Sequence, residues 1–159
     1  MRVIHESPNQ PDVIALIADL DAYQDSLYPA EARYALDIAS LSKPNVIFVV
    51  AREEQRTALG CGAVVLNESY GEVKRMYVRP EARGKGVAQA LIAALEASAY
   101  ESGCRELMLE TGPYQPEALS FYANQGYVRR RTFGPYSEHP LSVFMGKSLC
   151  LASSASSTV

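Results

Sequence analysis

The sequence is poor in cysteine and histidine. Its 159 residues include three cysteines and two histidines. Cys61, Cys104 and Cys150 are odd in number and lack the pairwise spacing of a zinc site or a redox motif. This usage is typical of reduced thiols in a cytosolic protein, where a cysteine fills a core position. We therefore expect a cytoplasmic protein that holds no metal.

The sequence also lacks an excess of positive charge and a long apolar run. Lys and Arg number 15 against 18 Asp and Glu, which gives a net charge of -3. This balance does not favour binding to nucleic acid or to an anionic membrane surface. No apolar stretch approaches the roughly 18 residues that span a bilayer, and the N-terminus lacks the apolar run of a signal peptide. We expect neither a nucleic-acid partner nor a membrane partner.

Length and composition favour one domain. Hydrophobic residues make up 48% of the chain, which is enough for one domain with a substantial core. The last residues are poor in large apolar side chains, which is typical of a weakly packed terminus. We expect a domain over residues 1–150 and a flexible tail over residues 151–159.

Hydrophobic periodicity predicts helices that are interspersed among strands. Helices are predicted at residues 10–23, around 30–41, at 87–103 and at 115–126. Strands are predicted at residues 46–52, 58–67, 71–78, 104–111, 127–133 and 141–149. We expect the first two strands to form a hairpin and the last two to pair.

A glycine-rich turn follows the third predicted strand. Gly84 and Gly86 expose consecutive N–H groups beside the positive end of the next helix dipole. Arg83 and Lys85 add full positive charges, so a phosphate or pyrophosphate is a suitable ligand. The glycines are equally compatible with a tight connection and nothing more. The P-loop pattern does not fit, because Lys85 precedes a glycine, and the dinucleotide pattern does not fit, because Gln89 replaces its last glycine.

The stretch 83–88, RGKGVA, resembles the acyl-CoA-binding motif of the GNAT family of N-acetyltransferases, whose pattern is R/Q-x-x-G-x-G/A. Residues 71–78 and 104–111 resemble the fourth and fifth strands of that family, and EALSFYANQGYV resembles its A-x-x-F/L-Y-x-x-x-G-F/Y segment. The resemblance covers roughly residues 46–149. It implies a single-domain α/β (α+β) fold, in which a mixed central sheet with splayed fourth and fifth strands is flanked by helices.

The resemblance further implies transfer of acetyl from acetyl-CoA to a primary amine, directly and in a ternary complex. The pantetheine arm would pair with the backbone of the fourth strand, and one N–H there would polarise the thioester carbonyl. Gln115 stands where the family often has asparagine, which keeps the amide chemistry with a longer reach. The implied cofactor-binding residues are Met76, Tyr77, Val78, Arg83, Gly84, Lys85, Gly86, Val87, Ala88, Thr111 and Gln115.

Two catalytic residues are carried over from the family. Tyr122 matches the tyrosine that protonates the departing thiolate, although it is also placed to pack beside Phe121 on the helix. Glu72 matches a glutamate that accepts the proton of the amine, although a solvent-facing glutamate at a strand start is an equal alternative. Glu110 is the reserve candidate for the base.

A covalent acyl-cysteine route is the competing mechanism. It needs an activated thiolate near a base. His5 and His139 lie near neither Cys61 nor Cys104 in the sequence, so we prefer direct transfer.

The acceptor is left open by the sequence. Carboxylates and aromatic faces suit a cationic amine, whereas the strand segment 129–131, RRR, suits either a substrate carboxylate or a solvated edge. Amino acids, polyamines, aminoglycoside-like drugs and protein amino groups all remain candidates. The residues that the family layout places in the acceptor groove are Tyr28, Glu31, Glu110, Tyr136 and Glu138.

Two other functions stay open at this point. The fold would also suit an acetyl-CoA sensor or interaction module without efficient catalysis, or a toxin-like enzyme that acetylates aminoacyl-tRNA. The acidic balance argues modestly against tRNA, which favours basic grooves. A homodimer is compatible with the sequence.

Overall fold

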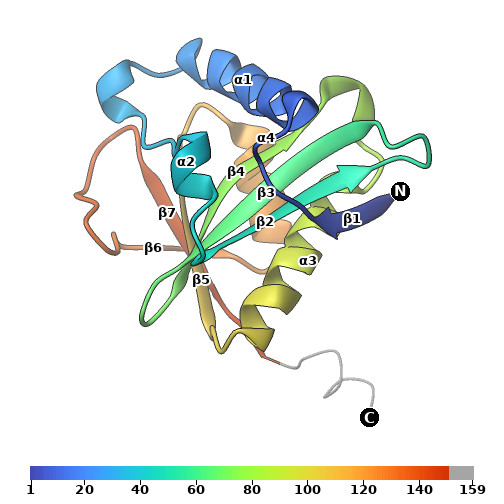
Figure 1. The fold of residues 1–159 in the computed structure, drawn as a ribbon. Coiled ribbons are helices and arrows are strands. Elements are labelled where there is room, and N and C mark those ends of the chain that lie inside the picture. Colours follow the sequence, from blue (N-terminus) through green and yellow to red (C-terminus); the bar gives the residue numbers. More distant parts are fainter. Residues whose placement is uncertain (151–159) are drawn as a thin grey trace.

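The computed structural model describes residues 1–150, and the tail predicted at 151–159 lies outside them. These residues form one seven-stranded mixed sheet with helices on both faces (Figure 1). The strands, in the spatial order of the sheet, are β1 (Arg2–His5), β2 (Val46–Arg52), β3 (Ala58–Leu66), β4 (Gly71–Val78), β5 (Glu106–Thr111), β7 (Val143–Ser148) and β6 (Val128–Arg130). The helices are α1 (Pro11–Asp25), α2 (Ile38–Leu41), α3 (Val87–Glu101) and α4 (Pro116–Asn124). No helix within residues 1–150 is both long and apolar enough to cross a membrane.

The two expected strand pairings are present. β2 and β3 form the predicted antiparallel hairpin, and β6 pairs with β7. β4 and β5 are the one parallel pair in the described sheet, and they are in register only at Gly71–Leu107 and Glu72–Met108. Beyond that end the two strands separate, which confirms the expected splay.

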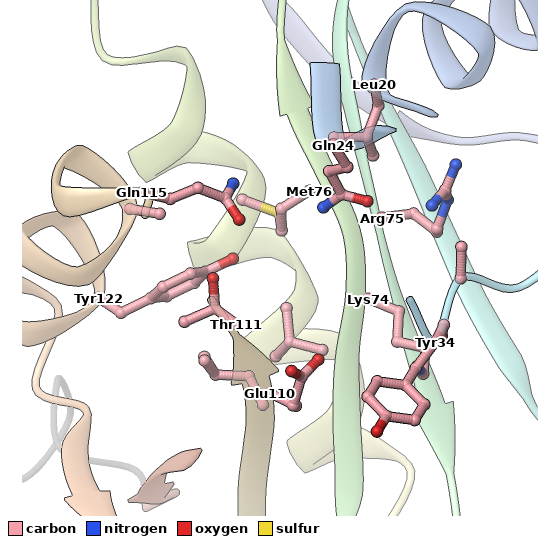
Figure 2. A pocket seen from close by; sticks show the side chains of 14 residues that line it. Leu20, Gln24, Tyr34, Lys74, Arg75, Met76, Glu110, Thr111, Gln115 and Tyr122 are labelled. Atoms are coloured by element: carbon pink, nitrogen blue, oxygen red, sulfur yellow. The ribbon is translucent and has the colours of Figure 1, made fainter. Parts of the chain in front are cut away.

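A β-bulge in β4 lies where the splay begins. Two consecutive residues, Arg75 and Met76, face Gly62 of β3. Arg75 has a positive φ of 57°, which is uncommon for a residue with a side chain. Figure 2 shows the Arg75 and Met76 side chains leaving the strand in different directions. Gly62 makes room for this arrangement, because a Cβ atom there would lie 2.4 Å from the Met76 sulfur.

Helices cover both faces of the sheet, and neighbouring residues of one strand pack against different helices. Val49 of β2 packs in one buried cluster with Leu91 and Leu95 of α3. Its neighbour Val50 packs in the other cluster, with Leu16 of α1. Successive strand side chains point to opposite faces, so α1 and α3 lie on opposite sides of the sheet (Figure 1).

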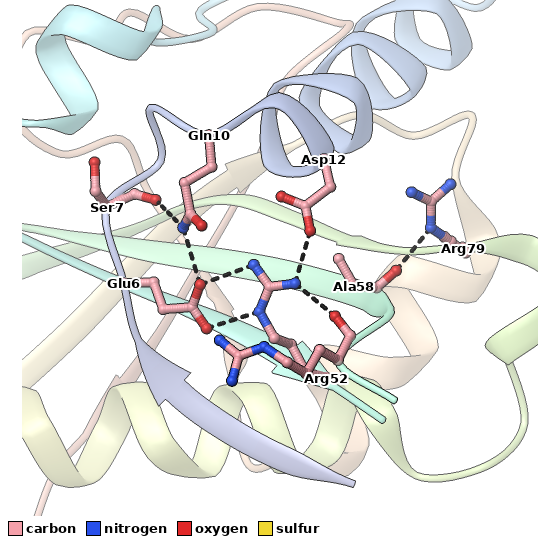
Figure 3. Close-up of polar contacts among 8 residues, drawn as sticks. Glu6, Ser7, Gln10, Asp12, Arg52, Ala58 and Arg79 are labelled. Atoms are coloured by element: carbon pink, nitrogen blue, oxygen red, sulfur yellow. Dashed lines mark hydrogen bonds and ion pairs between the residues drawn. The ribbon is translucent and has the colours of Figure 1, made fainter. Parts of the chain in front are cut away.

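A buried arginine anchors the start of α1 to the sheet (Figure 3). The Nε and Nη2 atoms of Arg52 each donate to the Glu6 carboxylate at 2.8 Å, and Nη1 donates to Asp12 at 2.7 Å. These hydrogen bonds from Arg52 hold the pKa of both carboxyl groups below their usual range. Gln10 adds a hydrogen bond to Glu6 at 2.9 Å. The connection from β1 to α1 is thereby fixed against β2.

Two local predictions differ from the structure. The helix predicted around 30–41 is a 3₁₀ turn at Ala30–Ala32 followed by the short α2, with an extended segment between them. The chain restarts as a helix because the Asp37 carboxylate accepts the Ser40 N–H at 2.8 Å and caps α2. β1 was not predicted, because its four residues are too few to show a strand period.

Candidate active site

Two cavities adjoin on the open side of the splay. A groove of about 670 Å³ runs along β4, the glycine-rich turn and the start of α3. A smaller cavity of about 110 Å³ lies where β4 and β5 diverge (Figure 2). The groove and the smaller cavity share five lining residues, which are Leu20, Met76, Gln115, Ala118 and Tyr122. A molecule in the groove can therefore present one end to the smaller cavity.

The glycine-rich turn leaves an unobstructed helix N-terminus in the groove. Gly84 and Gly86 have φ values of 75° and 82°, and no atom lies within 4 Å of a Cβ built at either position. Gly86 is the N-cap of α3, so the first N–H groups of that helix have no side-chain cap. Arg83 is held beside them, because its Nε donates to the Val78 carbonyl at 3.0 Å. Lys85 is exposed on the turn.

Most of the residues expected to bind the cofactor line the groove. These are Met76, Tyr77, Val78, Arg83, Gly84, Gly86, Val87, Ala88 and Gln115. Thr111 instead lines the smaller cavity, and Lys85 lies outside the lining of both. The turn and the start of α3 thus bring the N–H groups that are expected to bind an anion into the lining of the groove.

The ring of Tyr122 packs against other aromatic rings, and its hydroxyl faces the smaller cavity. Its ring lies edge-on to Phe121 at 5.2 Å and to Tyr127 at 5.6 Å, measured between ring centroids. Its hydroxyl points into the smaller cavity, toward Thr111 and Met76 (Figure 2). Burial raises the pKa of the Tyr122 hydroxyl well above its usual value of 10, so the group stays protonated at neutral pH.

Glu72 belongs to a buried polar cluster at the closed end of the splay. It is 7% exposed, and its carboxylate accepts the Tyr136 hydroxyl at 2.6 Å. Lys74 donates to the same hydroxyl at 2.9 Å and lies 3.4 Å from a Glu72 oxygen. Burial, reinforced by Glu72, raises the pKa of Tyr136. Glu72 is therefore not solvent-facing, and it lines neither of the two cavities described above.

Glu110 lies at the end of β5 and lines the smaller cavity. Burial raises the pKa of its carboxyl group, and the nearby Glu72 adds to this effect. A hydrogen bond with Ser142 and the charge of Lys74 act in the opposite direction. A carboxylate with a raised pKa beside a cavity is suited to accept a proton near neutral pH.

The other residues expected to bind the acceptor lie around the site rather than in the smaller cavity. The Tyr28 hydroxyl accepts the Tyr114 N–H at 3.0 Å, and the two rings stack with centroids 5.4 Å apart. Glu138 accepts the Thr132 N–H at 3.3 Å, and Glu31 is exposed on the 3₁₀ turn. Neither these three predicted residues nor Tyr136 is part of the lining of the smaller cavity.

Sequence reasoning missed several residues of that lining. Gln24 lies four positions after Leu20, so it continues the apolar stripe of α1 and could have been found from the helical period. Lys74 lies two positions after Glu72 on the same strand, which is a weaker signal. Tyr34 and Ala35 lie in the extended segment that was predicted to be helical, so no sequence signal placed them.

The cysteines lie outside both cavities. Cys61 is fully buried, its thiol donates to the Arg75 carbonyl at 3.4 Å, and burial raises its pKa to about 12. Cys104 is partly buried and contacts the Glu106 carbonyl. A thiolate at Cys61 is strongly disfavoured. Residues 1–150 contain no group of three or more His, Cys, Asp or Glu side chains placed to hold a metal ion.

The chain matches the acetyltransferase (GNAT) family over residues 13–127. It is 45% identical over 149 residues to the IAA acetyltransferase of Azospirillum brasilense, which covers 92% of this chain and 97% of that protein. A Klebsiella pneumoniae protein assigned to the acyl-CoA N-acyltransferases superposes with a TM-score of 0.80 at 41% identity, over 94% of this chain and 97% of that one. The PaiA N-acetyltransferase of Thermoplasma acidophilum, solved with coenzyme A, has a TM-score of 0.67 at 18% identity, over 93% of this chain and 99% of that one.

The family match, the near full-length relatives and the splayed sheet agree with the motif at residues 83–88. The chain belongs to the acetyltransferase (GNAT) family and is an acyl-CoA-dependent N-acyltransferase.

Proposed function

We propose that this protein transfers the acetyl group of acetyl-CoA directly to a primary amine in a ternary complex. The observation that carries the proposal is the shared wall of the two cavities. Met76 and Tyr122 line both, so a cofactor in the groove and an acceptor in the smaller cavity would meet beside them. Two reactants held side by side need no covalent enzyme intermediate.

Successive parts of the groove would bind successive parts of CoA. The pyrophosphate would bind the free N–H groups at Gly84 and Gly86, with Arg83 and Lys85 adding positive charge. The pantetheine arm would follow the backbone of residues 76–78 into the splay. A backbone N–H there would polarise the thioester carbonyl, and the Gln115 amide and Thr111 hydroxyl would contact the arm near the junction.

The transfer step uses two residues of the smaller cavity. The amine nitrogen forms a bond to the thioester carbonyl carbon, and the carbon–sulfur bond breaks. Glu110, directly or through a water molecule, accepts the proton that the amine loses. Tyr122 donates a proton to the departing thiolate and is reprotonated from solvent. We prefer Glu110 to Glu72 as the base because Glu110 lines the cavity, whereas Glu72 accepts the Tyr136 hydroxyl outside it.

The identity of the acceptor is tested first, by measuring CoA release. The free thiol of CoA would be measured with acetyl-CoA and a panel of amino acids, polyamines, aminoglycosides and lysine peptides. IAA would be added to the panel because it appears in the name of the 45% identical relative. We expect release that depends on one amine class. Binding of acetyl-CoA without release from any acceptor would instead favour the sensor. The predictions of no nucleic-acid partner, a homodimer and a cytoplasmic location remain predictions.

The pyrophosphate site is tested with Gly86→Asp. The added carboxylate would repel the pyrophosphate and strain the backbone at a φ of 82°, so we expect the Kd for acetyl-CoA in calorimetry to rise about tenfold or more. Gly103→Asp is the matched control, because Gly103 has a φ of 93°, equally open space and a place at the other end of α3. Equal affinity of the two variants would refute the site.

The role of Tyr122 is tested with Tyr122→Phe. Loss of the hydroxyl should lower kcat by about 10²-fold and leave the Kd for acetyl-CoA nearly unchanged, because the ring packing on Phe121 is kept. Tyr100→Phe removes a hydroxyl at the end of α3, outside the lining of both cavities, and should leave both constants unchanged. An unchanged kcat in Tyr122→Phe would remove this residue from the acid role.

The choice of base is tested by comparing Glu110→Gln with Glu72→Gln. We expect kcat to fall by about 10²-fold or more in the first variant, with loss of the acidic limb of the pH profile. That limb rises with pH because the raised pKa of Glu110 must be passed before the carboxylate forms. Glu72→Gln should keep the limb. The reverse pattern would assign the base to Glu72.

A further inference from the structure

The positive charge of Lys74 in the smaller cavity is already used by the protein. Its Nζ donates to the Tyr34 carbonyl at 2.7 Å and to the Tyr136 hydroxyl at 2.9 Å, and it pairs with Glu72 at 3.4 Å. The first two contacts are hydrogen bonds and use two of the three N–H donors of the ammonium group, and the Glu72 carboxylate offsets its charge. A substrate anion would have to compete with the Glu72 carboxylate for this charge.

The second cation that lines the cavity, Arg75, is directed to α1. Its Nη2 donates to the Asp21 carboxylate at 2.7 Å and lies 3.4 Å from the Ile17 carbonyl. The same Asp21 oxygen accepts a hydrogen bond from Arg33 at 2.9 Å. The Arg75 Nε has no partner, but it has almost no accessible surface either, and the side chain is 3% exposed. A ligand in the cavity therefore cannot reach this nitrogen while the Asp21 contact holds.

Glu110 is in the opposite situation. Within residues 1–150, no Lys, Arg or His nitrogen lies within 4 Å of its carboxylate. Ser142 takes one of the roughly four lone-pair positions of the group, which leaves capacity for a ligand. The side chains of Gln24, Thr111 and Gln115, which also line the cavity, are polar and neutral.

Among the described residues, the cavity thus offers a carboxylate without a cationic partner, whereas its two cations, Lys74 and Arg75, are each paired with a protein carboxylate. An ammonium group entering it gains a partner, whereas a carboxylate beside that ammonium would be desolvated without one. Resting on the proposed function, we propose that the acceptor is a primary amine on a neutral or cationic scaffold, with no carboxylate next to the reacting nitrogen. Amine ends of polyamines, amino sugars and arylalkylamines belong to this class, and free α-amino acids do not.

Pairs of amines that differ by one carboxylate test this proposal. Tyramine would be compared with tyrosine, and isopentylamine with leucine, in CoA release at saturating acetyl-CoA, because each of these molecules has a single amine. We expect kcat/KM, expressed for the neutral amine, to be about tenfold or more higher for the carboxylate-free member of each pair. Tyrosine methyl ester separates charge from size, because it is bulky but has no carboxylate, and it should resemble tyramine. Equal or higher values for the amino acids would overturn the proposal.

Binding decides the proposal even where no amine is turned over. Calorimetry on the CoA-loaded protein would use tyramine and tyrosine as probes, and we expect tyramine to bind about tenfold more tightly. Glu110→Gln should weaken tyramine binding and reduce this difference. Glu54→Gln, which alters an exposed carboxylate in the turn between β2 and β3, outside both cavities, is the control and should change neither. Tighter binding of tyrosine, or no binding of either probe, would overturn the acceptor class, whereas failure of acetyl-CoA itself to bind would overturn the proposed function.

Discussion

The separation of β4 from β5 is the constraint on which the site depends. A parallel pair that stayed in register would fill this space with its own hydrogen bonds, and neither cavity would exist. Pairing stops after Glu72 and Met108, and the bulge at Arg75 follows within a few residues. The bulge is an unfavourable backbone conformation for arginine, and it persists because surrounding contacts hold it. The Asp21 carboxylate on α1 holds the Arg75 side chain, so helix packing and strand geometry depend on each other.

The same bulge region also organises the charges. Lys74 and Arg75 are consecutive, yet Lys74 reaches Tyr34 and Tyr136 while Arg75 reaches Asp21. Asp21 in turn binds Arg33, at the start of the extended segment that supplies Tyr34 to the cavity wall. Each of these cations thus serves to assemble the cavity. The negative charge of Glu110 is left for a ligand.

Much of the fold could be predicted from the sequence, because its signals are local. The hairpin of β2 and β3, the strand–turn–helix at residues 71–103 and the helix that carries Tyr122 follow from hydrophobic period, glycine positions and motif. The bulge could not be predicted, since nothing in the sequence marks Arg75 for a positive φ. The environment of Glu72 was equally hidden, because its partner Tyr136 lies 64 residues away. Cofactor-side residues were accessible to motif reasoning, whereas the acceptor wall arises from long-range contacts.

The contact between Tyr28 and Gly112 joins the two sides of the splay. A Cβ atom at position 112 would lie 1.9 Å from the Tyr28 oxygen and 2.1 Å from the adjacent ring carbon, so even phenylalanine at position 28 would collide with it. The segment after α1 and the loop after β5 therefore cannot evolve independently. A lineage that gains a side chain at position 112 must first lose the ring at position 28, and the order of those two changes is set by sterics alone.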